Sequence, residues 1–257
     1  MTSSSSSPAL ELRRLSFQYP NGRTALDEIS CSISFGERIA IVGPSGAGKS
    51  TLLMHFNGLL PAPSISRDED AQVFIHSSPV TKPRLKEVRR QVGFLFQDPD
   101  DQLFCPTVQE DVAFGPLNLG LPRGEVMARI ERSLLAVGLP DYGQRNPSQL
   151  STGERKRVCL AGVFACEPSM LALDEPTSNL DPRARRQLLQ ILQQFPGTQM
   201  IATHDLDFVL DLCQRVIVLD GGRLQADGPA DQILSNTYLM ERHGLEVPWR
   251  LRRDSSS

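Results

Sequence analysis

The feature that most constrains the fold is a glycine-rich loop, GPSGAGKST, at residues 43–51. It follows the apolar run Ile39–Val42 and precedes the helix-compatible residues Leu52–Met54, which is the context that the pattern G-x-x-x-x-G-K-[ST] requires. Glycines let successive backbone N–H groups face one phosphate chain, and the helix N-terminus adds its positive dipole end. The sequence therefore predicts a strand, a phosphate-binding loop and a helix, rather than a simple glycine-rich turn.

Side chains within this loop have different tasks. Lys49 can reach the β- and γ-phosphates of a nucleotide, and the Ser50 hydroxyl can ligate Mg²⁺. We expect the whole loop to bind ATP: Gly43, Pro44, Ser45, Gly46, Ala47, Gly48, Lys49, Ser50 and Thr51.

A second candidate site follows the apolar run Met170–Leu173, which ends in the acidic pair Asp174-Glu175. Open α/β sheets bind ligands at the carboxyl ends of their strands. We therefore expect Asp174 to ligate the same Mg²⁺ and Glu175 to orient and deprotonate an attacking water. The alternative, in which Asp174 only caps a helix before Pro176, leaves the glycine-rich loop without this metal ligand.

Two strand patterns predict two kinds of sheet. Alternation of apolar and polar residues over 29–35 is typical of an antiparallel strand with one wet face, and its apolar members are Ile29, Cys31, Ile33 and Phe35. Continuous apolar runs indicate a parallel sheet covered by helices, and these runs are Ile39–Val42, Met170–Leu173, Met200–Ala202 and Val216–Leu219. We predict an α/β core preceded by a small antiparallel sheet.

Residues 100–165 have a different pattern. Val126, Ile130 and Leu134 recur at helical spacing, and prolines punctuate the segment. We expect a helical subdomain inserted into a single domain that spans residues 9–253.

Composition excludes several classes of protein. The 27 basic and 30 acidic side chains give a formal net charge of −3, which disfavours a nucleic-acid-binding protein and an acidic disordered chain. The longest apolar run, residues 158–166, is much shorter than the about 20 residues of a transmembrane helix. We expect a soluble chain without a signal peptide, in a reducing cytosol, with disordered serine-rich tails at 1–8 and 254–257.

The segment Leu150-Ser151-Thr152-Gly153-Glu154 fits an S-x-x-E capping box, which begins a helix. Beside the loop and the acidic pair, it also resembles the LSGGQ signature of ABC ATPases. Both interpretations can hold, because a capped helix N-terminus is an anion site as well.

The resemblance to ABC ATPases covers nearly the whole chain, with its motifs in the family's order. Tyr19 is similar to the A-loop aromatic that stacks on adenine, and Gln97 to the Q-loop glutamine that senses Mg²⁺ and the γ-phosphate. Residues 178–181, ending in Asp181, resemble the D-loop, and His204 resembles the switch histidine. The resemblance implies a P-loop (RecA-like) parallel-sheet core with an N-terminal antiparallel β subdomain and an inserted α-helical subdomain.

The family mechanism implies a second ABC ATPase subunit, in a homodimer or a heterodimer. Two subunits pack head to tail, so that the signature of one closes on the ATP held by the other. For this chain, the resemblance makes Glu175, His204 and Gln97 catalytic and assigns Mg²⁺ to Ser50, Gln97 and Asp174; the signature residues acting in trans are Ser151, Thr152, Gly153 and Glu154.

Two signature residues depart from LSGGQ. Thr152 replaces a glycine and adds a side chain where backbone usually approaches phosphate. Glu154 replaces glutamine, and its carboxylate is repelled by ATP unless it turns back to cap Ser151. Our hypothesis is that Glu154 is a capping residue and that Ser151 and backbone N–H groups contact phosphate.

The segment after Gln97, DPDDQLF, resembles the ATPase subunits of energy-coupling-factor importers, the cobalt CbiO and EcfA group. In that group it lines the groove that receives helices of the membrane scaffold. The implied docking residues are Asp101, Gln102, Leu103 and Phe104. In the alternative, Leu103 and Phe104 pack internally and the acidic residues are simply solvated.

The resemblance implies an ATPase on the cytoplasmic face of the cell membrane. It would energise uptake of a micronutrient, a cobalt or nickel ion or a vitamin such as biotin, through a membrane scaffold similar to EcfT or CbiQ and a substrate-binding membrane protein. A soluble ABC ATPase of the iron–sulfur assembly type and the ATPase of another separate-chain transporter are the alternatives. At the C-terminus we expect one helix, ending at Arg242, and therefore a dimer that depends on ATP or on the scaffold.

Overall fold

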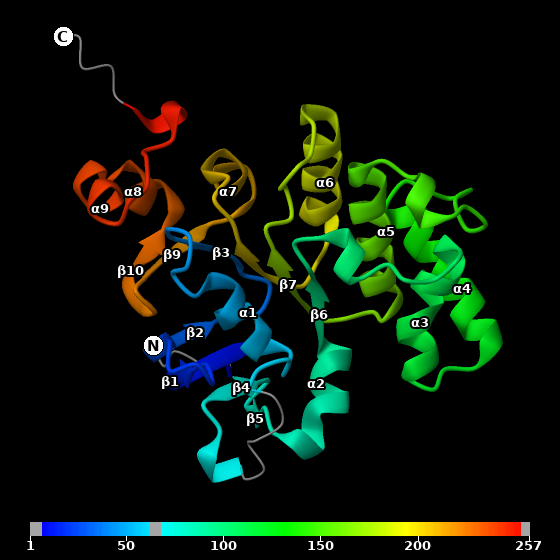
Figure 1. The fold of residues 1–257 in the computed structure, drawn as a ribbon, viewed down its shortest axis with the longest axis horizontal. Helices are drawn as coiled ribbons and strands as arrows, with labels where there is room; N and C mark the ends of the chain where they lie inside the picture. The colour runs from blue at the N-terminus through cyan, green and yellow to red at the C-terminus, as the bar shows by residue number, and fades with distance from the viewer. Residues whose placement is uncertain (1–6, 62–67, 253–257) are drawn as a thin grey trace, which may run out of the picture.

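The structure is a computed structural model that describes residues 7–61 and 68–252 (Figure 1). A four-stranded sheet near the N-terminus has the order β2-β1-β4-β5, and all of its pairings are antiparallel. Its strands are β1 (Leu10–Gln18), β2 (Thr24–Ile33), β4 (Val73–Ile75) and β5 (Ser78–Pro79). The predicted antiparallel sheet is therefore confirmed.

A six-stranded sheet of order β10-β9-β3-β8-β7-β6 forms the core. Only β10 is antiparallel to its neighbour; the other pairings are parallel. The strands are β3 (Arg38–Val42), β6 (Val92–Leu95), β7 (Met170–Asp174), β8 (Thr198–Ala202), β9 (Arg215–Asp220) and β10 (Arg223–Pro229). All four continuous apolar runs lie in this sheet, as predicted.

The six-stranded sheet is buried on both faces. Along β3, Ile39 and Ile41 belong to an apolar cluster that also contains residues of the antiparallel sheet and of α1, whereas Ala40 and Val42 belong to the cluster on the opposite face. This explains why these strands read as unbroken apolar runs: neither face meets water.

Helices surround this sheet. They are α1 (Lys49–Phe56), α2 (Leu85–Gln91), α3 (Val108–Asn118), α4 (Arg123–Ala136), α5 (Thr152–Ala165), α6 (Pro182–Gln194), α7 (Leu206–Leu212), α8 (Ala230–Ser235) and α9 (Thr237–Arg242). Short 3₁₀ helices occur at Asp68–Asp70, Lys82–Arg84, Pro99–Asp101, Pro147–Gln149 and Trp249–Leu251. Figure 1 shows α3, α4 and α5 together beyond the β6 edge of the sheet.

The helical segment follows its sequence pattern. Val126, Ile130 and Leu134 are the apolar residues that α4 buries. Helix α5 packs on both α3 and α4 and also contacts β6, so it joins the helical group to the sheet. Within residues 7–61 and 68–252, no helix is long and apolar enough to cross a bilayer.

Two expectations differ from the structure. Strand β2 ends at Ile33, and Phe35 is 57% exposed and stacks on His76. The chain turns there because Gly36 adopts a positive φ of 72°, so the strand ends two residues before the predicted alternation does.

At the C-terminus the structure has two helices where one was predicted. Asn236 ends the first helix and caps α9 by accepting a hydrogen bond from the Leu239 N–H. Of the predicted disordered tails, residues 1–6 and 254–257 lie outside the described residues.

Close packing of α5 on β6 gives a stability prediction. A Cβ on Gly93 would lie 2.4 Å from Val163 Cγ1 and 3.1 Å from Pro168 Cγ. We expect Gly93→Ala to lower the free energy of unfolding by about 2 kcal/mol, because the helix must move off the strand. Urea denaturation measures this change.

The matched control is Gly124→Ala in α4. Apart from its chain neighbours and the backbone of its own helix, no described atom lies within 4 Å of a Cβ placed there, and the position is helical and exposed. This substitution should raise the free energy of unfolding by about 0.5–1 kcal/mol, because alanine has the higher helix propensity. Equal effects of the two substitutions would contradict the packing argument.

Candidate functional site

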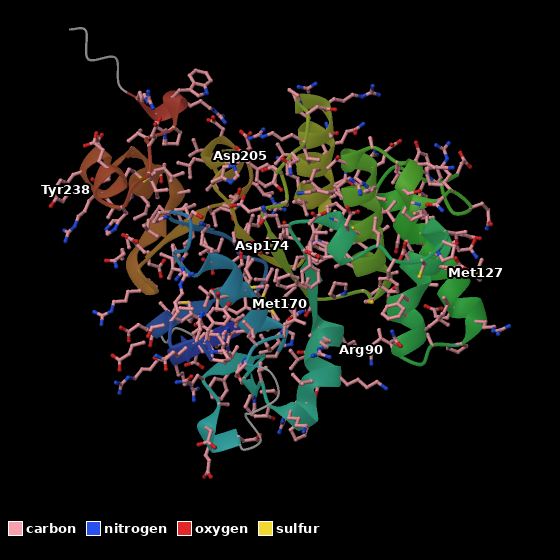
Figure 2. The ribbon with its side chains drawn as sticks, viewed as in Figure 1. Arg90, Met127, Met170, Asp174, Asp205 and Tyr238 are labelled. Carbon is pink, nitrogen blue, oxygen red and sulfur yellow. The ribbon has the colours of Figure 1, made fainter. Side chains whose placement is uncertain are left out.

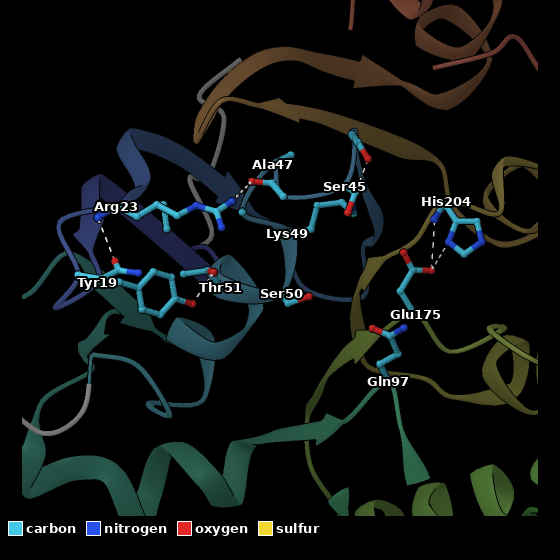
Figure 3. Close-up of a pocket in the computed structure, with 15 residues that line it drawn as sticks. Tyr19, Arg23, Ser45, Ala47, Lys49, Ser50, Thr51, Gln97, Glu175 and His204 are labelled. Carbon is cyan, nitrogen blue, oxygen red and sulfur yellow. Dashed lines mark hydrogen bonds and ion pairs between the residues drawn. The ribbon is translucent and has the colours of Figure 1, made fainter. Parts of the chain in front are cut away.

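A pocket of about 680 Å³ lies at the carboxyl ends of the parallel strands, around the glycine-rich loop. We call it the P-loop pocket. Figure 3 shows Tyr19 and Arg23 at one end of it, and Gln97, Glu175 and His204 at the other. Its remaining lining residues are Asn21, Ala25, Gly43, Ser45, Gly46, Ala47, Gly48, Lys49, Ser50 and Thr51. Pro44 lies in the same loop but is not among the lining residues.

Close backbone contacts require the glycines of the loop. A Cβ on Gly43 would lie 1.9 Å from the Leu219 carbonyl oxygen, and one on Gly48 would lie 2.5 Å from the Ala25 carbonyl oxygen. Gly48 also has a φ of 104°, which L residues rarely adopt. The loop therefore wraps tightly against the neighbouring strands and begins α1 at Lys49.

The Lys49 ammonium contacts the loop itself. Its Nζ donates to the Gly43 and Pro44 carbonyl oxygens at 2.8 and 3.0 Å. Burial lowers the pKa of Lys49, and the nearby carboxylates of Glu175 and Asp174 oppose that shift. The ammonium is thus held at the loop with two weak acceptors that phosphate oxygens could replace.

Asp174 and Ser50 form an oxygen cluster suited to a hard cation. Asp174 is 5% exposed and lies near the centre of the molecule (Figure 2). Desolvation raises the pKa of Asp174, and a hydrogen bond with the Ser50 side chain opposes this shift. Its Oδ1 is buried and has no hydrogen-bond partner in the part of the chain that the structure describes. A carboxylate with an unused buried oxygen beside a hydroxyl fits Mg²⁺, which prefers oxygen ligands.

Glu175 has a fixed side chain in an unusual backbone conformation. Its φ is 44°, and its N–H donates to the Ala202 carbonyl oxygen at 2.8 Å. Carboxylate oxygen Oε2 lies 2.8 Å from His204 Nδ1 and 3.2 Å from Thr203 Oγ1. The expected acid and the expected histidine are therefore direct neighbours at the ends of β7 and β8.

The aromatic end of the pocket is anchored to the P-loop helix. The Tyr19 hydroxyl lies 2.9 Å from Thr51 Oγ1, and the Tyr19 ring packs edge-on against Phe17. Sequence reasoning missed Arg23, which donates to the Gly46 carbonyl oxygen at 3.2 Å and adds a positive charge to the pocket. The sequence feature that indicates Arg23 is its position four residues after Tyr19, in the turn that leads into β2.

The signature segment lies in a different cavity, of about 610 Å³, which shares no residue with the P-loop pocket. We call it the signature cavity, and Ser151, Thr152, Gly153, Glu154 and Asp181 are among its lining residues. The Asp181 carboxylate caps α6 by accepting from the Ala184 N–H at 2.8 Å. Within one chain, the signature therefore does not meet the P-loop.

The predicted capping box begins α5. Glu154 Oε2 accepts from the Ser151 N–H at 2.9 Å and from the Ser151 hydroxyl at 2.7 Å, and Oε1 accepts from the Tyr142 hydroxyl at 2.7 Å. The Tyr142 bond, followed by those of Ser151, lowers the pKa of Glu154 to about 2. The carboxylate turns back onto its own chain, as the capping hypothesis requires.

The expected docking residues divide into two groups. Phe104 is 64% exposed and packs edge-on against the exposed Phe114, and Asp101 is exposed as well. Leu103 is half-buried against the core, and Gln102 donates to the Cys159 carbonyl oxygen at 3.1 Å and is an internal anchor. Asp101, Gln102, Leu103 and Phe104 line a mostly apolar cavity of about 380 Å³ together with residues of β6, α3 and α5.

The capping box predicts a pH-dependent stability. We expect Glu154→Gln to lower the free energy of unfolding by about 1 kcal/mol at pH 7, because the charged cap and the Tyr142 bond weaken. Since the pKa is about 2 in the fold and 4.5 in the unfolded chain, the loss is constant above pH 4.5 and shrinks as the pH falls toward 2. Urea titrations at pH 7 and 3.5 measure it.

Glu110→Gln is the matched control. Glu110 closes an equivalent capping box with Thr107 on α3, with bonds of 3.0 and 2.8 Å to the Thr107 N–H and hydroxyl. Because no tyrosine in the described part of the chain bonds to Glu110, its substitution should lower the free energy of unfolding by less. A Glu154→Gln loss that is the same at both pH values would contradict the assignment.

Comparisons with known proteins agree with this geometry. The ABC transporter family model matches residues 26–178. The energy-coupling factor transporter ATP-binding protein EcfA of Methanothermobacter thermautotrophicus is 44% identical over 244 residues, which cover 93% of this chain and 76% of that protein. EcfA of Carboxydothermus hydrogenoformans is 44% identical over 243 residues, covering 93% and 87%.

Solved structures give the same result. CbiO1 from Clostridium perfringens, described as part of the ABC transporter complex cbiONQ, superposes with a TM-score of 0.77 at 34% identity and covers 92% of this chain and 94% of that one. A dimeric ATP-binding cassette bound to ADP and phosphate has a TM-score of 0.74 at 25% identity, covering 86% and 98%. The chain belongs to the ABC transporter family, as an ATP-hydrolysing subunit of the energy-coupling-factor type.

Proposed function

We propose that this chain hydrolyses ATP in a two-subunit clamp, in which the signature segment of one subunit completes the P-loop pocket of the other. The observation that carries this proposal is the separation of the two cavities in one chain. The P-loop pocket has phosphate-binding and acidic residues but no part of α5, so a second subunit must supply Ser151 and Gly153. The partner is a second copy or a related ABC ATPase.

In the proposed reaction, Glu175 takes a proton from water while the water oxygen attacks the γ-phosphorus. The bond from that phosphorus to the bridging oxygen breaks, and ADP and phosphate leave. His204 and Thr203 hold the Glu175 carboxylate in place through Oε2. Lys49 exchanges its loop carbonyls for phosphate oxygens.

Two further parts of the site bind the nucleotide. Tyr19 lies at the end of the pocket where a base can stack. Ser50, Gln97 and Asp174 would hold Mg²⁺, which when bound neutralises the negative charge of the phosphate oxygens.

We also propose that the clamp energises uptake of a micronutrient through a separate membrane scaffold similar to EcfT or CbiQ, at the cytoplasmic face of the membrane. The cavity lined by Phe104 supports this role, because an exposed aromatic pair beside an apolar hollow fits a partner helix. The exposed carboxylate of Asp101 favours a helix with basic residues. The names of the EcfA relatives and of the CbiO1 structure support the same assignment.

In this proposal, the transported substrate binds to another polypeptide and not to this chain. A small substrate-binding membrane protein would select a cobalt or nickel ion, or a vitamin such as biotin. The competing function is a soluble assembly ATPase of the iron–sulfur type. That function gives no reason for the exposed Phe104–Phe114 pair.

Glu175→Gln tests the importer role. The variant should bind ATP but hydrolyse it at least about a hundredfold more slowly, because the amide cannot take a proton from water. Tagged in its host and solubilised gently with MgATP, it should co-purify with a polytopic scaffold and a small membrane protein, identified by mass spectrometry. Recovery of soluble partners alone would favour the assembly ATPase.

A double substitution, Asp101→Arg with Phe104→Ala, tests the docking surface. It reverses the charge and removes the exposed ring, so co-purification with membrane proteins should be lost while nucleotide binding stays within about twofold. The control is Glu131→Arg with Leu135→Ala, an equivalent charge reversal and apolar truncation on the exposed side of α4. Unchanged co-purification of the first variant would refute the docking role.

A further inference from the structure

A lysine is buried beside the acidic pair, in a position that the reaction proposed above leaves unused. Lys156, on α5, is 1% exposed. Its Nζ donates to the Glu175 carbonyl oxygen at 2.9 Å, the Pro176 carbonyl oxygen at 3.1 Å and Ser178 Oγ at 2.9 Å. An ammonium has three N–H donors, and here all three are used on one short loop.

The loop that receives these bonds needs support. Glu175 has a φ of 44°, in the left-handed region that residues other than glycine rarely adopt. Pro176 follows and has no N–H, so the backbone around Glu175 has few donors of its own. The bonds recorded there are Glu175 N–H to Ala202 and Ser178 N–H to the Glu175 carbonyl oxygen. Lys156 binds the two carbonyls that follow the strained φ angle.

The charge of Lys156 suits this place. Burial lowers its pKa to about 8, and Cys159 and the carboxylates of Glu175, Asp98 and Asp174 oppose that shift. The side chain therefore remains mainly protonated at pH 7. A buried cation that bonds to backbone carbonyls directs those carbonyls toward itself, and the Glu175 side chain toward the pocket.

Helix α5 connects this lysine to the signature. Lys156 lies five residues after Ser151, which corresponds to a rise of about 7 Å along the helix. The first turn of α5 also packs on α6, where a Cβ on Gly153 would lie 2.7 Å from that of Ala184. In the proposed clamp, the same helix therefore meets the nucleotide of the partner at its N-terminal end and the loop of Glu175 about 1.4 turns later.

We propose that Lys156 is a positioning residue for hydrolysis: its ammonium holds the Glu175–Ser178 loop so that the Glu175 carboxylate faces the P-loop pocket. This inference rests on the proposed role of Glu175 as the group that takes a proton from water. Lys156 also connects Glu175 in one nucleotide site to α5, whose signature segment completes the other nucleotide site.

The test is Lys156→Met, which keeps an unbranched side chain of similar length but removes all three donors. Measured on the folded protein, kcat for ATP hydrolysis should fall at least about tenfold while KM changes less than about threefold, because nucleotide contacts are untouched. Lys156→Gln, which restores two N–H donors on a shorter and uncharged side chain, should recover only part of the rate. A Lys156→Met enzyme with the native kcat would overturn the proposal.

A double-mutant cycle with Glu175→Gln separates positioning from a general structural effect. If Lys156 acts through Glu175, adding Lys156→Met to Glu175→Gln should lower the residual single-turnover rate by less than about twofold. An additional full loss would show an independent effect and overturn the proposal. If Glu175→Gln alone keeps the native rate, the assigned role of Glu175 fails instead, whatever Lys156→Met does.

A matched control and a milder variant complete the design. Arg129→Met removes another well-buried cation, which donates to the Ala165 carbonyl oxygen at 3.1 Å at the far end of α5, and it should leave kcat unchanged. If Lys156→Met does not fold, Ser178→Ala tests the proposal instead, because it removes only one of the three acceptors of the Lys156 ammonium. It should lower kcat about twofold to fivefold without additivity to Glu175→Gln; a native rate would contradict the proposal.

Discussion

The hydrogen-bond register between neighbouring parallel strands brings the P-loop, the acidic pair Asp174-Glu175 and His204 to one edge of the sheet. Asp174 of β7 pairs with Ala202 of β8, and Ala202 pairs with Ile41 of β3. The three strands therefore end at one level, and the residues that follow them meet at one edge of the sheet. A slip of one residue would turn the Asp174 side chain to the other face of the sheet and move Glu175 away from Thr203. Burial on both faces opposes such a slip.

That register requires an unfavourable backbone conformation in the loop after β7. Turning the chain so that Glu175 faces the P-loop pocket beside the buried Asp174 puts Glu175 in the left-handed region. The structure compensates with contacts from two directions: β8 binds the Glu175 N–H, and Lys156 of α5 binds the carbonyls that follow. Because α5 belongs to the helical group, the loop at the sheet edge depends on how that group packs.

Much of this arrangement could be predicted from the sequence, since local patterns encode it. Continuous apolar runs identify buried parallel strands, and the glycine-rich loop and the acidic pair follow such runs directly. The rest depends on tertiary contacts. Lys156 lies between two arginines in a basic run that looks like a solvated helix face, and only packing of α5 against the sheet reveals that it is buried. Gln102 turns inward for a similar reason, because its partner on Cys159 is 57 residues away.

The two cavities of the proposed clamp differ in how completely the chain satisfies their charges. Among the described residues, Lys49 of the P-loop pocket is bonded only to loop carbonyls, and Oδ1 of the neighbouring buried Asp174 has no partner. In the proposed clamp, a nucleotide with its cation would supply what the chain lacks. In the signature cavity, the Glu154 carboxylate already accepts three hydrogen bonds.

One of those three bonds uses the proton of the Ser151 hydroxyl, which must leave Glu154 before it can donate to a phosphate. Tyr142 and the Ser151 N–H still hold the carboxylate when the hydroxyl turns away. Glutamate can therefore stand at this position in the signature, because its charge stays bonded to its own chain in both orientations of Ser151. In the proposed clamp, the P-loop pocket therefore needs its ligand for charge balance, whereas the signature segment is preorganised without one.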